Sequence, residues 1–183
     1  MIQFKELVLG TTYDELMMIR KWRSSVDVNK FMYTDSKPTP EEQVRWFEST
    51  LKDDSCKYMI ISYKNIDVGM VYLTDIDYIS KHCNWGIYIG EKKYKVGVGA
   101  MATYKLINYV FDDLKLNKLI SMVLSYNKDA INLNESFGFK QEALYKQHCF
   151  KDDKFIDMFG FSLLKKDWIK LKPYFKGKFS NEK

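Results

Sequence analysis

The chain has 183 residues, of which 46% are hydrophobic and 16% are aromatic. This length and composition predict one compact domain with a sizeable core. Lys and Arg number 29 against 24 Asp and Glu, a formal net charge of +5. Residues 165–183 hold seven Lys against Asp167 and Glu182, so this segment carries the whole excess. The rest of the chain is near neutral, which argues against the broad basic face of a nucleic-acid-binding protein.

The sequence also argues against a membrane protein and a metal protein. Its apolar runs, such as residues 59–61, are far too short to cross a bilayer, and the first five residues lack the apolar core of a signal peptide. Three cysteines without Cys-x-x-Cys spacing predict a reduced, cytoplasmic protein, and two histidines without ligand-like neighbours predict no metal site. We expect one domain over residues 1–175, followed by a solvated basic tail over residues 176–183.

In the first third of the chain, a predicted strand is followed by two predicted helices. Residues 2–8 alternate sufficiently between apolar and polar side chains to form a half-buried strand. Thr12 and Glu15 form a capping box that opens a helix ending near Arg23. A second capping box, Thr39-Pro40-Glu41-Glu42, opens a helix with proline at its favoured first position.

The middle of the chain is predicted to form three strands. Residues 57–63 and 68–74 flank the sequence Lys64-Asn65-Ile66-Asp67, which predicts a hairpin. Residues 83–89 form the next strand, after a turn over residues 75–82.

A glycine-bearing loop follows this strand and precedes a well-patterned helix. The loop reads Tyr94-Lys95-Val96-Gly97-Val98-Gly99, and apolar residues then recur at three- and four-residue spacing as far as Leu114. A helix N-terminus leaves about four backbone N–H groups unpaired and carries partial positive charge. Because two glycines let a large anion approach this backbone, the loop is a candidate pyrophosphate site. By itself, a Gly-x-Gly loop is equally typical of a plain strand-to-helix turn.

A second patterned unit follows in the last third of the chain. Residues 119–125 predict a buried strand, Asn127 precedes a short helix, and Phe137-Gly138-Phe139 leads into another strand. The remaining expected elements are a hairpin and a terminal helical turn, over residues 139–150, 154–163 and 167–175.

Taken together, the loop and the second unit resemble the GNAT superfamily of acetyl-CoA-dependent N-acetyltransferases. Gly97 and Gly99 match the two glycine positions of the family's Gln/Arg-x-x-Gly-x-Gly/Ala loop, and Asn127 with Ala130 matches its Asn-x-x-Ala motif. Tyr94 departs from the usual Gln or Arg, but backbone N–H groups do most of the phosphate binding. The resemblance implies an α/β (α+β) fold, with a mixed, mostly antiparallel sheet and helices on both faces.

Further stretches resemble the nucleotide-sugar N-acetyltransferases of pseudaminic acid synthesis. They are Lys21-Trp22-Arg23, Phe31-Met32-Tyr33-Thr34, Gln43-x-x-Trp46-Phe47-Glu48 and residues 72–77, 84–90 and 144–148. Those enzymes acetylate the 4-amino group of UDP-4-amino-4,6-dideoxy-N-acetyl-β-L-altrosamine. Residues 135–139 and the last hairpin are also similar to the GNAT branch that acetylates protein N-termini. A peptide acceptor therefore stays open, as does a catalytically silent acetyl-CoA-binding module.

The resemblance implies acetyl-CoA as co-substrate, with its pantetheine arm between two splayed strands and its pyrophosphate in the glycine loop. The predicted cofactor residues are Ile87, Tyr88, Ile89, Tyr94, Lys95, Val96, Gly97, Val98, Gly99, Ala100, Asn127 and Asn134. A nucleotide-sugar acceptor needs a cation for its diphosphate and flat apolar surface for its rings. The predicted acceptor residues are Arg23, Met32, Tyr33, Trp46, Thr74 and Asn84. A surface ion pair for Arg23 and core packing for Trp46 are the alternatives.

In the implied mechanism the acceptor amine attacks the thioester directly in a ternary complex and must lose a proton. The predicted proton-transfer residues are Asp75, Asp77, His82 and His148 as bases, and Tyr126 and Asn134 on the acid side. An Asp-x-Asp in a turn is also common turn chemistry. Many GNATs have a Tyr where this chain has Asn134, which is no acid, so the role is unfilled or is taken by Tyr126 or water. A thiol pKa of about 8.5 makes this loss tolerable. A homodimer is compatible with the sequence.

Overall fold

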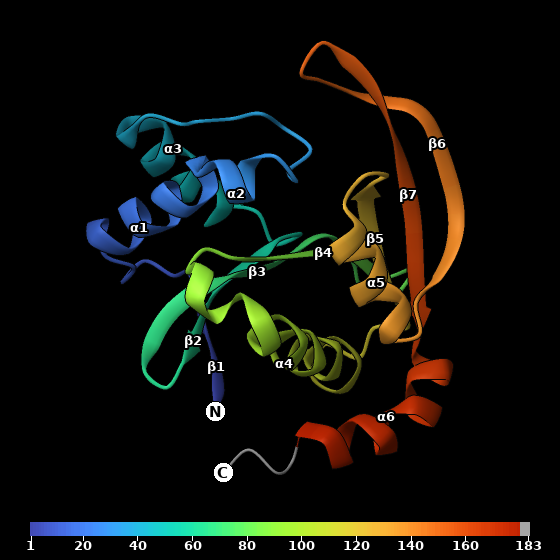
Figure 1. Cartoon of the computed structure of the whole chain (residues 1–183). Coiled ribbons are helices and arrows are strands. Elements are labelled where there is room, and N and C mark those ends of the chain that lie inside the picture. Colours follow the sequence, from blue (N-terminus) through green and yellow to red (C-terminus); the bar gives the residue numbers. More distant parts are fainter. Residues whose placement is uncertain (180–183) are drawn as a thin grey trace.

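The computed structural model describes residues 1–179 and confirms the predicted mixed sheet (Figure 1). The strands are β1 (Ile2–Glu6), β2 (Lys57–Tyr63), β3 (Ile66–Asp77), β4 (His82–Ile89), β5 (Lys118–Leu124), β6 (Lys140–Lys151) and β7 (Lys154–Leu164). They form one seven-stranded sheet in the order β1-β2-β3-β4-β5-β7-β6. Only β4 and β5 pair in parallel, and the other neighbours are antiparallel. Residues 180–183 of the predicted tail lie outside the described residues.

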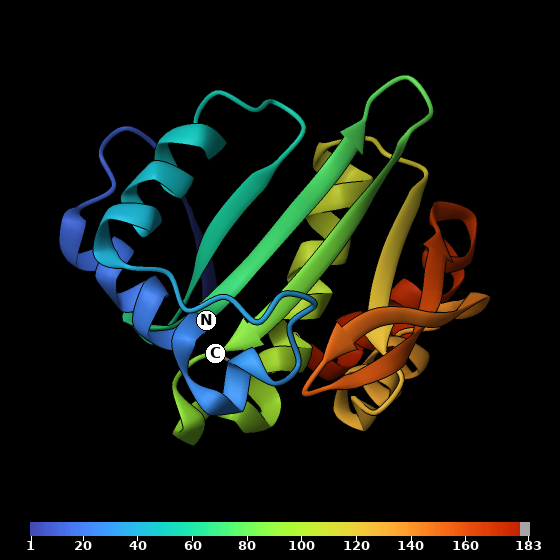
Figure 2. The same cartoon turned by 90° about the horizontal axis from the view of Figure 1, so that it is seen from above.

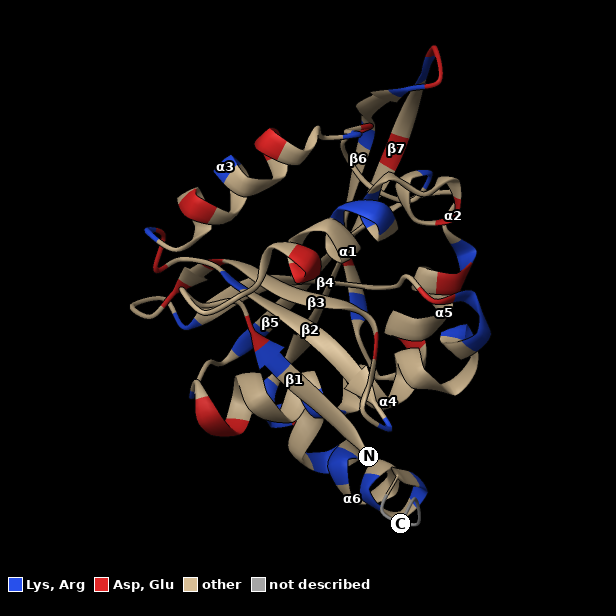
Figure 3. Ribbon diagram, turned by 90° about the vertical axis from the view of Figure 1, so that its left-hand side faces the viewer, with Lys and Arg blue, Asp and Glu red and all other residues tan. Residues whose placement is uncertain are grey.

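Helices cover both faces of this sheet, as predicted (Figure 2). They are α1 (Tyr13–Ser24), α2 (Val26–Asn29), α3 (Pro40–Thr50), α4 (Lys95–Asn108), α5 (Lys128–Ser136) and α6 (Lys165–Phe179). The first three pack on one face of the sheet, whereas α4 and α6 pack on the other. Lys and Arg residues gather on α6, where the sequence places the excess positive charge (Figure 3).

Strand alternation separates the core into two layers. Ile60, Met70 and Tyr88 pack with the buried side chains of α1 and α3. Their strand neighbours Ile61 and Val71 point to the opposite face and pack with those of α4. Because successive side chains of a strand point to opposite faces, a central sheet covered on both sides needs apolar residues at nearly every position.

Both predicted capping boxes are present. At α1, the Glu15 N–H donates to Thr12 Oγ1 at 3.3 Å, and the Thr12 N–H donates to Glu15 Oε2 at 2.8 Å. Thr39 and Glu42 make the same reciprocal pair at the start of α3, at 3.2 and 2.7 Å. Each cap satisfies helix N–H groups that would otherwise be unpaired and contributes about 1 kcal/mol.

Four elements differ from the prediction. The helix predicted to reach Leu114 is α4 only as far as Asn108 and continues as a π-helix, η2 (Tyr109–Asp113). The short helix α2 was not predicted. The turn between β2 and β3 has two residues instead of the four predicted, so β3 begins at Ile66. Its residues Lys64 and Asn65 both have positive φ, at 51° and 61°, as a two-residue turn requires. The terminal helix continues to Phe179, whose ring lies 5.2 Å from that of Tyr104, so the apolar stripe of α6 extends past residue 175.

The end of β4 lies directly against α1. A Cβ atom at Gly90 would lie 2.1 Å from Trp22 Cγ, so only glycine permits this contact. The Trp22 indole N–H donates to Glu91 Oε1 at 3.0 Å. Helix α1 is thereby fixed to the residues that immediately precede the glycine loop. Within residues 1–179, no helix is long and apolar enough to cross a membrane.

Candidate active site

The glycine loop bends sharply before α4 becomes regular. Val96 is extended, and Gly97 has φ 86° and ψ −46°, a conformation that L side chains rarely adopt. A Cβ atom added at Gly97 or Gly99 would meet nothing within 4 Å. Both positions therefore face open space at a helix N-terminus, where backbone N–H groups and the helix dipole favour an anion.

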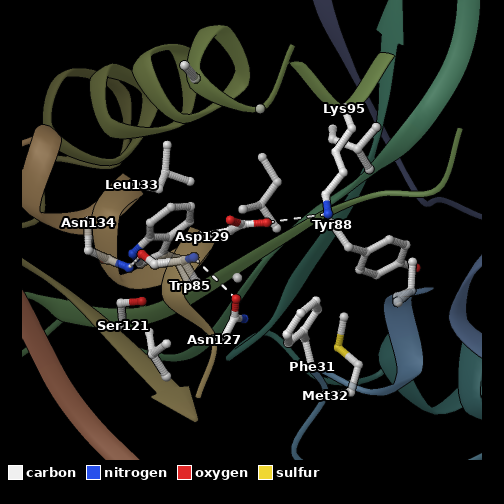
Figure 4. Close-up of a pocket in the computed structure, with 18 of the residues that line it drawn as sticks. Phe31, Met32, Trp85, Tyr88, Lys95, Ser121, Asn127, Asp129, Leu133 and Asn134 are labelled. Atoms are coloured by element: carbon white, nitrogen blue, oxygen red, sulfur yellow. Dashed lines mark hydrogen bonds and ion pairs between the residues drawn. The ribbon is translucent and has the colours of Figure 1, made fainter. Parts of the chain in front are cut away.

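Beside this loop, β4 and β5 separate and leave a cleft between them. Their parallel pairing covers only three residue pairs and ends at Asn84 and Ile120, although β4 continues to Ile89 and β5 to Leu124. A cavity of about 530 Å³ occupies the gap. Its walls are the unpaired edge of β4, residues of β5, the glycine loop and one side of α5 (Figure 4). The predicted splayed strands are present, and a long ligand with an anionic end fits this shape.

Helix α5 places two asparagines on the cavity wall. Asn127 is the N-cap, and its Oδ1 accepts from the Ala130 N–H at 3.2 Å. Asn134 donates from Nδ2 to the Ala130 carbonyl at 2.8 Å, which leaves its Oδ1 buried without a partner. On the facing strand, Trp85 Nε1 is also buried and unpartnered. An unpaired acceptor and an unpaired donor on one cavity suit a ligand that contains amides, as pantetheine does.

Two ion pairs flank the glycine loop. Lys92 Nζ lies 2.5 Å from Asp27 Oδ2 of α2, and Lys95 Nζ lies 3.4 Å from Asp129 Oδ2 of α5. The second pair spans the cavity in Figure 4. All four side chains are well exposed, so the pairs contribute little to stability, but they place two ammonium groups beside the loop. Among residues 1–179, no group of three His, Cys, Asp or Glu side chains could hold a metal ion.

A second cavity, of about 430 Å³, lies on the α1 and α3 side of the sheet. It brings together four of the predicted acceptor residues, Arg23, Met32, Tyr33 and Trp46. The Trp46 ring lies edge-on to Tyr58 at 4.8 Å, and Tyr58 stacks on Tyr72 at 5.8 Å. The two cavities meet, since three residues line both: Met32, Tyr72 and Tyr88.

The electrostatics of the second cavity are dominated by Arg23. Its Nη2 donates to the carbonyl and the hydroxyl of Thr34, at 2.8 and 2.9 Å. Its Nη1 is buried without a partner, and no ion pair within residues 1–179 includes it. Burial lowers the pKa of Arg23, yet a guanidinium stays charged at neutral pH. The wall therefore holds a cation without an ion-pair partner in the described residues, and the nearby Asp35 favours its charged form.

The tyrosines of this wall are neutral. Burial raises the pKa of Tyr58 to about 12. Burial also raises the pKa values of Tyr72 and Tyr88. The Tyr88 hydroxyl donates to Met70 Sδ at 3.1 Å. These side chains offer flat surface and neutral hydroxyl groups, and none is a base near pH 7.

Most predicted cofactor residues line the first cavity. They are Ile87, Tyr88, Ile89, Lys95, Val96, Gly97, Gly99, Ala100, Asn127 and Asn134. Val98 is instead buried in the core under α4. Tyr94 packs at the edge of the same core, with its ring 6.0 Å from that of Tyr63.

The predicted bases of the β3–β4 turn line neither cavity. Asp77 accepts from the Ile79 and Ser80 N–H groups, at 2.8 and 2.7 Å. The Ser80 backbone bond is the largest cause of its lowered pKa. His82 Nε2 lies 3.9 Å from this carboxylate, and Asp75 accepts from Asn84 Nδ2 at 2.7 Å. The structure thus uses both aspartates in local turn contacts, the alternative that Asp-x-Asp left open. Two predicted acceptor residues, Thr74 and Asn84, face each other in this same hairpin.

Two further candidates lie behind the loop that precedes α3. The Tyr126 hydroxyl donates to the Lys30 carbonyl, and burial raises the Tyr126 pKa. The His148 ring packs 6.1 Å from Tyr33 and 5.1 Å from Tyr145. Neither Tyr126 nor His148 lines a cavity, but each contacts the segment that does.

Several cavity residues were missed from the sequence. Trp85 and Ser121 line the first cavity, and Tyr58 and Tyr72 line the second. The alternation of residues 83–89 could have identified Trp85, because it shares a face with Ile87 and Ile89. Tyr58 and Tyr72 lie opposite each other on β2 and β3. The sequence predicts this hairpin, but their pairing follows only once its register is known.

Comparison with known proteins agrees with this geometry. Residues 7–140 match the model of the "Acetyltransferase (GNAT) domain" family. The acetyltransferase PseH of Campylobacter jejuni is 31% identical over 125 residues, which cover 68% of this chain and 76% of that protein. A putative ribosomal N-acetyltransferase of Bacillus subtilis, YdaF, is 27% identical over 55% of each chain.

Among solved structures, the spermidine N-acetyltransferase of Vibrio cholerae, crystallised with CoA and spermine, superposes with a TM-score of 0.84. The match covers 92% of this chain and 98% of that one at 18% identity, so it shows a shared fold. The chain therefore belongs to the GNAT acetyltransferases, the acetyl-CoA-dependent enzymes that its glycine loop and second unit resemble.

Proposed function

We propose that this enzyme acetylates the 4-amino group of a UDP-aminodeoxy sugar, of the kind used in pseudaminic acid synthesis. The observation that carries the proposal is the second cavity, where a half-buried Arg23, with its Nη1 buried and unpartnered, lies beside an aromatic wall. A nucleotide sugar offers a diphosphate to the cation and flat rings to the aromatic side chains. The likeness to PseH supports the same acceptor class.

In this proposal, the acceptor lies across the second cavity and directs its amine to the junction at Met32, Tyr72 and Tyr88. Arg23 binds the diphosphate, and Trp46 with Tyr33 packs against the uracil or the sugar. The 4-amino group then reaches the first cavity, where acetyl-CoA supplies an activated acetyl group. Because both reactants share one site, the reaction becomes effectively unimolecular, which is worth on the order of 7 kcal/mol for good alignment.

The chain's own residues bind and orient the donor. The backbone of residues 96–100 holds the pyrophosphate, and the free edge of β4 hydrogen-bonds the pantetheine arm. Asn134 Oδ1 accepts from a pantetheine N–H, since its Nδ2 is already used by Ala130. A backbone N–H near Ile87 stabilises negative charge that develops on the carbonyl oxygen.

Proton transfer is assigned to solvent. A sugar amine needs only a modest base, and Asp75, Asp77 and His82 line neither cavity. We propose that water in the acceptor cavity takes the proton, with His148 behind Tyr33 as a secondary base. The thiolate leaves without a protein acid, because position 134 is an asparagine and Tyr126 lines neither cavity.

Two other acceptors are worth testing. A polyamine, the acceptor in the name of the Vibrio cholerae relative, would need carboxylates. The carboxylate that lines the second cavity is Glu42, which already caps α3, and Arg23 would repel a cation. A protein N-terminus is favoured by the match to the putative ribosomal N-acetyltransferase.

The three free cysteines, Cys56, Cys83 and Cys149, support the cytoplasmic setting that the proposal assumes. The predicted homodimer is also part of it and is testable by light scattering.

A substrate panel tests the proposal. Wild-type enzyme and acetyl-CoA are incubated with the UDP-4-amino sugar, with spermidine and with a peptide that has a free N-terminus, while CoA thiol release is followed. Turnover of the UDP-sugar is expected. Turnover of the peptide or of spermidine alone would replace this acceptor, and acetyl-CoA binding without turnover of any amine would identify a silent binding module.

A further inference from the structure

The segment between α2 and α3, residues 30–38, forms much of the acceptor cavity wall. We call it the acceptor loop. It runs from the α1 side of the molecule toward the β6–β7 hairpin on the other side of the cleft (Figures 1 and 2). Met32, Tyr33, Thr34, Ser36 and Pro38 line the second cavity, and Met32 also lines the first.

Side chains from both halves of the molecule hold the backbone carbonyls of this loop. From the N-terminal half, Arg20 Nε donates to Pro38 at 2.6 Å and Arg23 Nη2 donates to Thr34 at 2.8 Å. From the C-terminal half, the contacts on the loop are Tyr126 to Lys30, Lys151 to Met32 and Cys149 to Tyr33. The loop is therefore fixed largely through its backbone carbonyls, and the side chains of Met32 and Tyr33 line the second cavity.

Lys151, near the tip of the hairpin, is the most unusual of these contacts. Its side chain is only 3% exposed, whereas lysine is rarely buried unless it is paired. Its Nζ donates to the carbonyls of Asn29 at 3.0 Å and Met32 at 3.3 Å, and lies 3.6 Å from Asp35 Oδ1. All of its polar contacts are thus to the acceptor loop and its first flanking residue. Because a buried ammonium needs all of these oxygen partners, the contact favours a single conformation of the loop.

The placement of Met32 gives this contact a consequence for the reaction. Met32 lies where the two cavities meet, the point at which the acceptor amine must reach the acetyl group. The parallel pairing of β4 and β5 covers only three residue pairs, so side-chain contacts such as those of Lys151, Cys149 and Tyr126 with the loop tie the two halves together beside the cleft. The Lys151 contact spans 119 residues in sequence and links the hairpin to this junction.

We propose that Lys151 is a positioning residue for acetyl transfer, which holds Met32 and the acceptor loop in the conformation that receives the amine. It acts through the loop and touches neither substrate. The proposal rests on the second cavity being the acceptor site of the proposed function, but it does not depend on which amine binds there.

The test compares Lys151→Met, which keeps the apolar stem, with Lys151→Arg, which restores donors to the carbonyls. Loss of a hydrogen bond from a charged group changes an equilibrium constant roughly tenfold or more. Lys151→Met should therefore raise the KM for the acceptor about tenfold. The acetyl-CoA dissociation constant should change by less than about twofold, because the glycine loop is untouched. Lys151→Arg should recover part of the acceptor affinity. Lys154→Met is the control, since this exposed lysine of the same hairpin contacts no cavity.

The acceptor used is whichever amine the wild-type enzyme acetylates in the panel, so failure of the UDP-sugar does not decide this test. Hydrogen exchange gives a readout that needs no acceptor. In the wild type, the Met32 amide should exchange more slowly than the turn at residues 78–81, and Lys151→Met should accelerate exchange across residues 30–38. An unchanged acceptor KM, or equal losses of donor and acceptor affinity, would overturn the proposal. If Lys151→Met does not fold, fast exchange of Met32 in the wild type would overturn it as well.

Discussion

The two cavities of this enzyme are built in different ways. The first cavity, where we place the donor, combines backbone features, two glycines at a helix N-terminus and a strand edge without a partner, with side chains of α5 and β5. The second cavity, where we place the acceptor, is formed by side chains from α1, α3, β2, β3 and β4 and by a loop that is fixed from both halves of the molecule. Backbone can be recognised in a short motif, whereas a wall of distant side chains cannot. The donor site can thus be recognised from local sequence, whereas the acceptor site is recognised only in the tertiary structure.

The largest expected effect is on the donor side. Gly99→Val would fill the open space above the helix N-terminus with a branched side chain and should weaken acetyl-CoA binding about a hundredfold or more, because several charge-assisted backbone contacts are lost together. Calorimetry measures the affinity. Gly10→Val, at another position where a Cβ meets nothing, should bind normally. Gly97→Val should lose binding as well, with added backbone strain from its φ of 86°. Normal binding by both loop variants would contradict the backbone cradle.

A smaller effect is expected on the acceptor side. Arg23→Met removes the cation of the second cavity and should raise the acceptor KM about tenfold or more, with less than about a twofold change in acetyl-CoA affinity. Initial-rate kinetics with each substrate varied will separate the two. Arg45→Met, an exposed arginine on α3, serves as the control. Equal losses for donor and acceptor would mean that the two cavities are not functionally distinct.

The neutral wall of the acceptor cavity predicts a pH dependence of stability. Burial raises the folded-state pKa of Tyr88 above that of the unfolded chain. Its neutral form therefore stabilises the fold below about pH 10, and this contribution is lost as the pH rises toward the folded pKa, at up to about 1.4 kcal/mol per pH unit. Urea unfolding at pH 8 and at about pH 10.5 should show this loss, and Tyr88→Phe should lose less. An identical pH slope in the variant would show that Tyr88 ionises freely.

The smallest effect concerns the rim of the donor cavity. Asp129→Asn removes the carboxylate that faces Lys95 and should tighten acetyl-CoA binding about two- to threefold at low salt, because the freed ammonium lies beside the phosphate loop. Added salt should abolish the gain. Asp112→Asn breaks the comparable pair with Lys172 away from this cavity and should leave the affinity unchanged. A gain in both variants would reflect net charge alone.

The sequence predicted more of the fold than of the reaction. The capping boxes at Thr12 and Thr39 and the glycine loop are local patterns, and each formed where it was expected. The role of Asp75 and Asp77 was ambiguous, because the sequence of a turn is the same whether its carboxylates accept hydrogen bonds from the turn or accept a proton from a substrate. Only three-dimensional placement distinguishes the two. The alternation of β4 places Trp85 on the same face as Ile87 and Ile89, but its unpaired indole N–H can be recognised only when every neighbour is known.

The close contact at Gly90 bears on how the two substrates bind in time. Trp22 packs on that glycine and donates to Glu91, while the next residue, Arg23, lines the second cavity. A shift of α1 on loading one cavity would therefore reach the turn beside the other cavity. The rate law should consequently show synergy, with saturation by the first ligand lowering the half-saturating concentration of the second.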